Sequence, residues 1–224
     1  MGAVLTDYVA RTRQAVDWYW KALNQPTSRM EGFHALVSRI VADNDLPNAR
    51  VHTSHEMKLP GFFTPARKWD MVVMHEGRLV AALGIRAWAG PPSEHGLVAM
   101  AEEAICTGKE MDTLSRQQAF GSGLRPWFGW LVLLKDSPAI TQPAPATATF
   151  FRLLPEYRNS SQAERCERLL RELERHRLFD ACSLLLCNEE RKQPGYYREP
   201  TRDLGIKRFL THLAGHTSVF AACR

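Results

Sequence analysis

The stretch KWDMVVMHEGRLVAALGIRAWAGP, residues 68–91, contains the clearest strand pattern of this chain. Two β-branched and apolar runs, 71–74 and 79–88, flank the short polar segment HEGR, whose Gly77 suits a turn that needs positive φ. The pattern predicts a β-hairpin. Because both strands are apolar on both faces, we expect helices to cover the sheet on its two sides.

Outward from the hairpin, the chain alternates between helical and strand patterns. The expected order is helix, helix, strand, hairpin, helix, strand, helix, strand, helix, which is typical of a mixed α/β protein with helices on the faces of a central sheet. The predicted helices cover 5–23, 28–44, 97–114, 160–179 and 200–216, and the predicted strands outside the hairpin cover 49–57, 127–134 and 181–187. Two further expectations are that the last helix ends near Gly215 and that the Pro/Ala/Thr-rich segment 137–149 is a loop or insert.

The length of 224 residues favours one large domain that can bury a sizeable core. We predict a single domain over 1–224. Its N-terminal helices are expected in 1–48, its core sheet and helices in 49–187, and a C-terminal helix and tail in 188–224.

The composition excludes several classes of protein. With 45% hydrophobic and 24% charged residues, the chain is neither disordered nor membrane-like. No apolar run reaches the roughly 20 residues that cross a bilayer, and the first 20 residues lack the features of a signal peptide. We therefore expect a cytoplasmic location and no membrane partner. The five cysteines form no Cys-x-x-Cys pair, which favours reduced thiols over disulfides or a zinc site.

The net charge of +5 is compatible with a polyanionic partner. The sequence contains no dense Lys/Arg block, however, and arginines on solvated helix faces explain the excess as easily. The charge alone therefore does not identify a partner.

The predicted hairpin also carries the residues that bear on chemistry. A metal-dependent phosphodiesterase holds Mg²⁺ against the scissile phosphate with oxygen ligands, usually two carboxylates, and benefits from a nearby lysine. The widespread nuclease pattern is an aspartate, a variable gap and Glu-x-Lys on the next strand. Here Asp70 is followed 14 positions on by Gly84, and Arg86 lies two positions further. The spacing is present, but the second acid and the lysine are absent.

An ordered series of further stretches extends from about residue 28 to residue 214. They are MEGF (30–33), LPGFFTPARKWDMVV (59–73), EGRLVAALGIRAWAGP (76–91), AEEAICTGKEMD (101–112), FGSGLRPWFGWLVLLKD (120–136) and GYYREPTRDL (195–204). In this series the chain resembles type II restriction endonucleases of the Xho type, which cut duplex CTCGAG and carry the PD-(D/E)XK fold. The resemblance implies an α/β, restriction-endonuclease-like fold with a central mixed sheet flanked by helices.

The resemblance places the family's first metal-binding aspartate at Asp70, its glutamate at Gly84 and its lysine at Arg86. Glycine offers no ligand oxygen, so Asp70 alone would hold Mg²⁺ poorly. Arginine stays charged at any working pH and cannot replace a lysine that acts as a base. The family's stretch after its lysine is polar and asparagine-rich, whereas residues 87–100 read AWAGPPSEHGLVAM. We therefore expect no DNA cleavage by the family mechanism and no bound cofactor.

The remaining pair of charged residues has two simple explanations. Asp70 and Arg86 are expected to form a partly buried salt bridge that preserves the hairpin, and this is the interpretation we favour. In the other, Arg86 acts with Arg67 or Lys68 to receive an anion such as phosphate or sulfate.

A relocated metal site is a third alternative. Glu102 and Glu103 lie on the following predicted helix, within reach of the open end of the hairpin, and Lys109 or Lys68 could replace the lost lysine. Such a site would bind Mg²⁺ through Asp70 and one of these glutamates. The structural alternative is that both glutamates belong to a solvated helix face.

These observations predict a protein whose nuclease chemistry has been lost. The first hypothesis is a non-cutting accessory subunit that binds a partner protein, in a hetero-oligomer or a homodimer, for instance in a bacterial specialised-metabolite pathway. Apolar residues at a former active-site mouth favour this role. The alternative is a protein that acts on duplex DNA, either as a DNA binder or as an active type II endonuclease with the relocated site.

Overall fold

A six-stranded mixed sheet forms the centre of the protein, and its computed structural model describes residues 2–25, 29–53, 55–90, 94–145, 152–188 and 193–223. The strands lie in the order β1-β4-β5-β6-β9-β10. Their bounds are Arg50–Thr53 for β1, Met71–His75 for β4, Arg78–Trp88 for β5, Trp127–Lys135 for β6, Ala181–Cys187 for β9 and Tyr197–Arg198 for β10. β5, β6 and β9 are parallel, and the other neighbours pair antiparallel.

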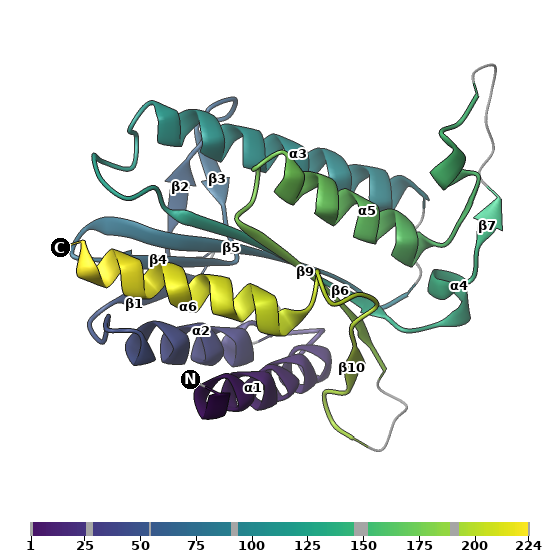
Figure 1. The fold of residues 1–224 in the computed structure, drawn as a ribbon, viewed down its shortest axis with the longest axis horizontal. Coiled ribbons are helices and arrows are strands. Elements are labelled where there is room, and N and C mark those ends of the chain that lie inside the picture. The colour runs from purple at the N-terminus through teal and green to yellow at the C-terminus, as the bar shows by residue number, and fades with distance from the viewer. Residues whose placement is uncertain are drawn as a thin grey trace.

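Two layers of helices enclose the sheet (Figure 1). Helices α1, α2 and α6 cover one face, and α3 and α5 cover the other. Their bounds are Gly2–Lys21 for α1, Glu31–Asp43 for α2, Glu94–Arg116 for α3, Gln162–Arg175 for α5 and Ile206–Ala222 for α6. The predicted α/β class, with a central mixed sheet flanked by helices, is confirmed.

The alternation of side chains along β5 explains why its sequence is apolar throughout. Leu83 and Ile85 belong to the core beneath α1, α2 and α6, whereas Ala82 belongs to the core beneath α3 and α5. Successive residues of a strand point to opposite faces, so a strand buried on both faces needs apolar residues at every position.

The predicted β4–β5 hairpin is present, with its turn at Glu76 and Gly77. Both turn residues have positive φ, 49° and 77° respectively. Two consecutive residues in this region are typical of the tight turns that match the right-handed twist of paired strands. The turn pairs His75 with Arg78, and a β-bulge between Val73 and Met74 then shifts the register, so that Met71 at the start of β4 pairs with Leu83 of β5.

A second, smaller hairpin was not predicted from the sequence. It consists of β2 (Lys58–Pro60) and β3 (Ala66–Lys68), and it forms a separate two-stranded sheet. The hairpin lies beside α3, and its second strand leads through Trp69 and Asp70 directly into β4 (Figure 1). It therefore stands at the same end of β4 as the candidate site.

Two sequence-based expectations about the second half of the chain were wrong. The last helix continues beyond Gly215 to Ala222, because Thr217 and Phe220 extend its buried face and hold the additional turns against the core. The segment 137–149 is more than a loop, since it holds the short helix α4 (Pro138–Thr141) and strand β7 (Ala144–Pro145). Its residues 146–149 lie outside the described part of the chain.

The connection from this segment to α5 contains the remaining short elements. These are the 3-10 helix η1 (Pro155–Tyr157) and strand β8 (Asn159–Ser160), which pairs with β7. α5 then begins at a capping box in which Ser161 and Glu164 exchange side-chain and backbone hydrogen bonds.

Three further predictions concern the cysteines, membrane-spanning helices and the number of domains. All five cysteines are free thiols, as predicted. Among the described residues, no helix has both the length and the apolar character needed to span a membrane. The division of the chain into one domain over 1–224 stays a prediction.

Candidate functional site

Asp70 lies immediately before β4, beside the far end of β5. Its Oδ2 accepts a hydrogen bond from the backbone amide of Ile85 at 2.7 Å and another from Nη1 of Arg86 at 2.8 Å. The side chain of Asp70 is 17% exposed and that of Arg86 is 24% exposed. The structure therefore contains the partly buried salt bridge that the sequence predicts, and this bridge ties the two strands together.

A second carboxylate, from α3, binds the same guanidinium. Nε of Arg86 donates to Oε2 of Glu103 at 2.9 Å, and Nη2 donates to Oε1 of the same residue. Burial alone would lower the pKa of Arg86, but the carboxylates of Glu103 and Asp70 outweigh burial and raise it. Arg86 is thus a fixed positive charge between two carboxylates that come from different elements.

Trp130 completes the surroundings of the guanidinium. The Cζ of Arg86 lies 4.7 Å from the centroid of the Trp130 ring, in a cation–π arrangement. Trp130 pairs with Gly84 across the parallel β5–β6 register, and its side chain is buried. Gly84 and Arg86 lie two positions apart on one strand, so the indole is beneath both of them.

The space next to Gly84 is filled by this indole. A Cβ added to Gly84 would lie 2.4 Å from Cζ3 and 2.5 Å from Cε3 of Trp130. No side chain fits there unless the ring moves. The position to which the resemblance assigns the family's glutamate therefore lacks both the carboxylate and the room for one.

The resemblance implies Mg²⁺, and the donor set of this site does not fit that ion. Mg²⁺ requires near-octahedral oxygen ligands at about 2.0–2.1 Å. Asp70 and Glu103 both accept hydrogen bonds from Arg86, whose charge occupies the space between them. Across the part of the chain that the structure describes, no group of three or more His, Cys, Asp or Glu residues could hold a metal.

The structure brings together some of the predicted site residues and separates others. Asp70, Arg86 and Glu103 form one cluster. Glu102 is exposed on α3, and Lys68 is exposed on β3. Neither residue contacts the cluster through any recorded hydrogen bond or ion pair among the described residues. Of the apolar stretch 87–100, residues 91–93 lie outside the described part of the chain.

At the predicted anion site, the charges of Arg86 and Arg67 are both already paired with carboxylates. Arg86 is bound to two carboxylates, and Arg67 donates to Oε2 of the buried Glu110 at 2.6 Å. Lys68 is different, since it has no ion-pair partner among the described residues.

Sequence reasoning missed the role of Trp130. The predicted strand 127–134 includes this residue, but the β5–β6 register that sets the ring against Gly84 depends on tertiary structure. The available signal was the two-residue spacing of Gly84 and Arg86, which puts both on one face of a strand. Because glycine has no side chain, a large side chain from a neighbouring strand must fill the space on that face next to Gly84.

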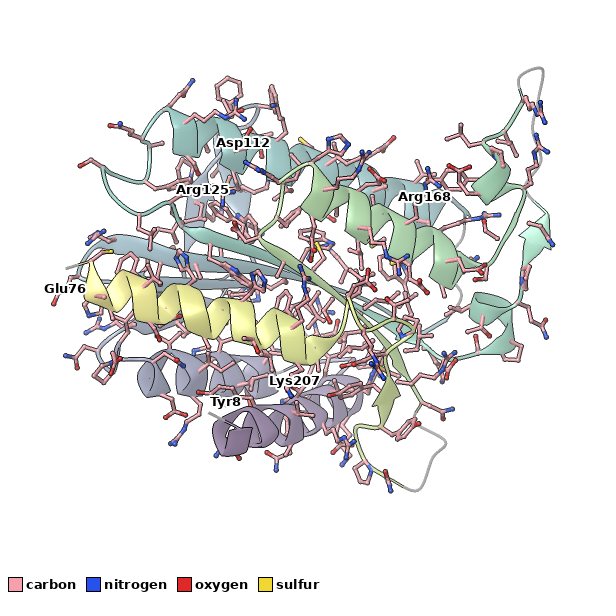
Figure 2. All side chains as sticks on the ribbon, viewed as in Figure 1. Tyr8, Glu76, Asp112, Arg125, Arg168 and Lys207 are labelled. Atoms are coloured by element: carbon pink, nitrogen blue, oxygen red, sulfur yellow. The ribbon has the colours of Figure 1, made fainter. Side chains whose placement is uncertain are left out.

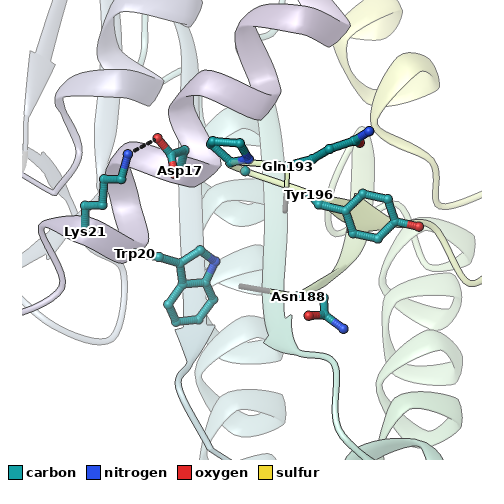
Figure 3. Close-up of a pocket in the computed structure, with 8 residues that line it drawn as sticks. Asp17, Trp20, Lys21, Asn188, Gln193 and Tyr196 are labelled. Atoms are coloured by element: carbon teal, nitrogen blue, oxygen red, sulfur yellow. Dashed lines mark hydrogen bonds and ion pairs between the residues drawn. The ribbon is translucent and has the colours of Figure 1, made fainter. Parts of the chain in front are cut away.

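A cavity elsewhere in the protein does not belong to this cluster. It has a volume of about 320 Å³ and lies between α1 and the segment that precedes β10 (Figure 3). Trp20 and Tyr196 contribute to its wall, and Lys21 pairs with Asp17 beside it at 2.7 Å. None of its lining residues belongs to the Asp70–Arg86–Glu103 cluster.

Comparison with known proteins gives a consistent result. The model of the family described as restriction endonuclease XhoI matches residues 12–199. The type II restriction enzyme BstVI of Geobacillus stearothermophilus is 31% identical over 199 residues, covering 87% of this chain and 89% of the relative. AbrI of Azospirillum brasilense is 33% identical over 172 residues, covering 68% of this chain and 78% of the relative.

XhoI of Xanthomonas vasicola, also a type II restriction enzyme, is 33% identical over 146 residues, covering 64% of this chain and 59% of the relative. No solved structure matches the chain. The family match covers well over half of the chain and includes the hairpin that carries Asp70 and Arg86. This chain belongs to the XhoI restriction endonuclease family.

Proposed function

We propose that this chain is a restriction-endonuclease-like protein that binds duplex DNA without cutting it. The observation that carries the proposal is the Arg86 guanidinium held between Asp70 and Glu103. A positive side chain neutralises the carboxylates that a nuclease of this fold would present to a divalent cation. Because arginine keeps its proton at any working pH, ordinary changes of pH do not reverse this arrangement.

Phosphodiester hydrolysis needs groups that this site does not supply. A metal ion in such a reaction stabilises charge on the phosphate and activates the attacking water. Arg86 directs its donors at Asp70, Glu103 and the carbonyl of Ile85, which leaves it poorly placed to stabilise a transition state. Trp130 fills the position next to Gly84 where a further ligand would stand.

Binding to duplex DNA is supported by the relatives and by charge. All three relatives named above are type II restriction enzymes. The chain carries a net charge of +5, compatible with phosphate contacts. Two lysines close to the candidate site in sequence are exposed and have no ion-pair partner among the described residues, Lys58 and Lys68.

Fluorescence anisotropy with a labelled duplex that contains CTCGAG tests the proposal. We expect saturable binding in EDTA as well as in Mg²⁺, with an affinity that falls steeply as salt rises, because bound phosphates release their counterions. A duplex with a scrambled site measures how much specificity remains. No binding at low salt, with the protein folded by circular dichroism, would refute the proposal.

The accessory-subunit role is the second candidate, and one observation favours it. An apolar groove of about 460 Å³ lies between α3 and α5, and its wall includes Val98 and Ile105. These two side chains are 51% and 49% exposed. Exposed apolar surface of this kind is common at protein interfaces.

Co-purification from the native host distinguishes the second candidate. A partner that binds this groove should be lost from the Val98→Asp/Ile105→Asp variant. It should be retained by the control Val219→Asp, which alters an equally exposed valine on α6. Recovery of no partner with the unmodified chain would remove the support for this role.

A further inference from the structure

The β2–β3 hairpin places two lysines directly opposite each other. Lys58 pairs with Lys68 in the antiparallel register, and both side chains are exposed. Side chains at such positions have their Cβ atoms about 4.5–5.5 Å apart, and like charges placed there repel each other. Neither lysine has an ion-pair partner among the residues that the structure describes. An anion between them would relieve the repulsion.

The tip of the same hairpin exposes two aromatic rings. Phe62 is 45% exposed and Phe63 is 62% exposed, and the rings meet edge to face with centroids 5.0 Å apart. The loop that carries them is tight, since a Cβ on Gly61 would lie 2.2 Å from the carbonyl oxygen of Thr64. Two large apolar side chains on a short exposed loop are costly in water without a partner.

A buried carboxylate fixes this hairpin in place. Glu110 of α3 has no exposed side-chain surface. It accepts hydrogen bonds from the backbone amide of Phe63 at 2.9 Å and from Nε of Arg67 at 2.6 Å. This carboxylate therefore holds the backbone of the loop that carries the two phenylalanines before any partner binds.

The hairpin and the Asp70–Arg86–Glu103 cluster are held by the same face of α3. Glu103 binds Arg86 of β5, and Glu110 binds Arg67 of β3. Seven residues separate the two glutamates, so they lie two turns apart, about 10 Å along the helix. A large ligand that contacts the Asp70–Arg86–Glu103 cluster can therefore also contact the β2–β3 hairpin.

We propose that the β2–β3 hairpin is a DNA-contact element, in which Lys58 and Lys68 bind backbone phosphates while Phe62 and Phe63 pack against a sugar or base edge. We choose duplex DNA as the partner because it offers a binding surface for both pairs of side chains. Its phosphates can bind the two lysines, and the adjacent apolar surface of its nucleotides can contact the two phenylalanines. This inference rests on the proposed DNA binding and names the surface that performs it.

The lysine contribution is tested by the salt dependence of duplex binding. The Lys58→Gln/Lys68→Gln variant should reduce the slope of log affinity against log salt by about two units, because each lost phosphate contact removes roughly one released counterion. The matched control is Lys21→Gln/Lys207→Gln, which removes two exposed charges from α1 and α6. Figure 2 shows Lys207 on α6, on the other side of the sheet from Asp112 of α3. The control should retain most of the slope.

The phenylalanines provide a second and independent readout. Phe62→Ala/Phe63→Ala should weaken binding at least roughly fivefold, as expected for lost stacking or apolar contact with a nucleotide. The salt slope should stay unchanged, because neutral side chains release no counterions. Trp18→Ala, which removes an exposed ring on α1, is the matched control and should bind normally.

The possible results distinguish a failure of the hairpin inference from a failure of the proposed DNA binding. If the unmodified chain does not bind DNA, the proposed function fails. If the chain binds DNA but both hairpin variants match their controls in affinity and slope, the hairpin inference alone is overturned. Captured protein that is lost from the phenylalanine variant, without any DNA binding, would instead assign the hairpin to a protein partner and refute the inference.

Discussion

The Trp130 ring leaves no room for a side chain at position 84, where the resemblance implies a metal-binding glutamate. A Cβ at Gly84 would lie 2.4 Å from the buried Trp130 ring, so Gly84→Ala should lower the free energy of unfolding by about 1–3 kcal/mol through overpacking. Gly90→Ala is the matched control, since its added Cβ meets no atom within 4 Å among the described residues other than its chain neighbours. Urea denaturation of the two variants measures the difference. Equal stability would show that the indole moves aside without cost.

Restoring the missing motif residues gives a second prediction at this scale. Gly84→Glu combined with Arg86→Lys rewrites the Asp, Glu and Lys pattern of the family. We expect no Mg²⁺-dependent cleavage of a CTCGAG duplex, because Trp130 still fills the space beside position 84. Cleavage that disappears when Asp70→Asn is added would contradict this and show that only two substitutions separate the chain from an active nuclease.

At this scale the sequence predicted the Asp70–Arg86 pair but not its surroundings. The spacing along the hairpin was sufficient to place one aspartate against one arginine. The selection of Glu103 rather than Glu102 depends on how α3 is rotated over the sheet, and the position of Trp130 depends on strand register. Both are set by tertiary packing.

Among the elements, α3 has the largest effect on the candidate site, because it holds two arginines from two different hairpins. Glu110→Gln should lower the free energy of unfolding by about 2 kcal/mol, since it weakens charged hydrogen bonds to Arg67 and to the Phe63 amide. Glu102→Gln, at an exposed position of the same helix, is the control and should change stability by less than about 0.5 kcal/mol. Chemical denaturation near neutral pH checks both.

The same glutamate predicts a pH dependence. Burial would raise the pKa of Glu110, but the bonds from Arg67 and the Phe63 amide outweigh it and hold the pKa below the ordinary 4.5. A carboxyl whose pKa is lowered by folding adds stability above pH 4.5, and this stability is lost as pH falls through the lowered value. The stability difference between the unmodified chain and Glu110→Gln should therefore shrink on acidification below pH 4.5. A difference that stays constant with pH would exclude an ionised Glu110.

Two helical glycines distinguish close packing from open surface. A Cβ on Gly32 of α2 would lie 2.7 Å from the Cα of Ala15 in α1, whereas Gly215 of α6 has no atom within 4 Å of its added Cβ. Gly215→Ala should raise the free energy of unfolding by about 0.5–1 kcal/mol through helix propensity. Gly32→Ala should lower it by about 1–3 kcal/mol. Thermal denaturation of the pair tests this, and a stabilising Gly32→Ala would contradict the close α1–α2 contact.

Most elements were predictable from the sequence because their patterns are long. The helical period identified α1, α2, α3 and α5, and the buried runs identified β4, β5, β6 and β9. The β2–β3 hairpin was missed because its strands have three residues each and its stability comes from Glu110, 42 positions beyond β3. The end of α6 was placed too early because a solvent-facing glycine was taken as a stop.

For the molecule as a whole, the fold class followed from the order of helices and strands, and the family followed from an ordered series of motifs. Function does not follow from either, because a fold supports activity only where its site residues permit it. In this chain the β4–β5 hairpin is present, and Gly84 and Arg86 stand at the positions where the resemblance implies the second acid and the lysine. For this chain we therefore propose DNA binding without hydrolysis.

A plasmid assay measures binding and cleavage together. The unmodified chain is incubated with supercoiled DNA that contains CTCGAG, in Mg²⁺ and separately in Mn²⁺, and both the retarded complex and the DNA topology are followed on gels. We expect a salt-sensitive complex in which the plasmid stays supercoiled. Linear plasmid cut at CTCGAG by the unmodified chain, but not by Asp70→Asn or Glu103→Gln, would contradict it and establish a working relocated metal site.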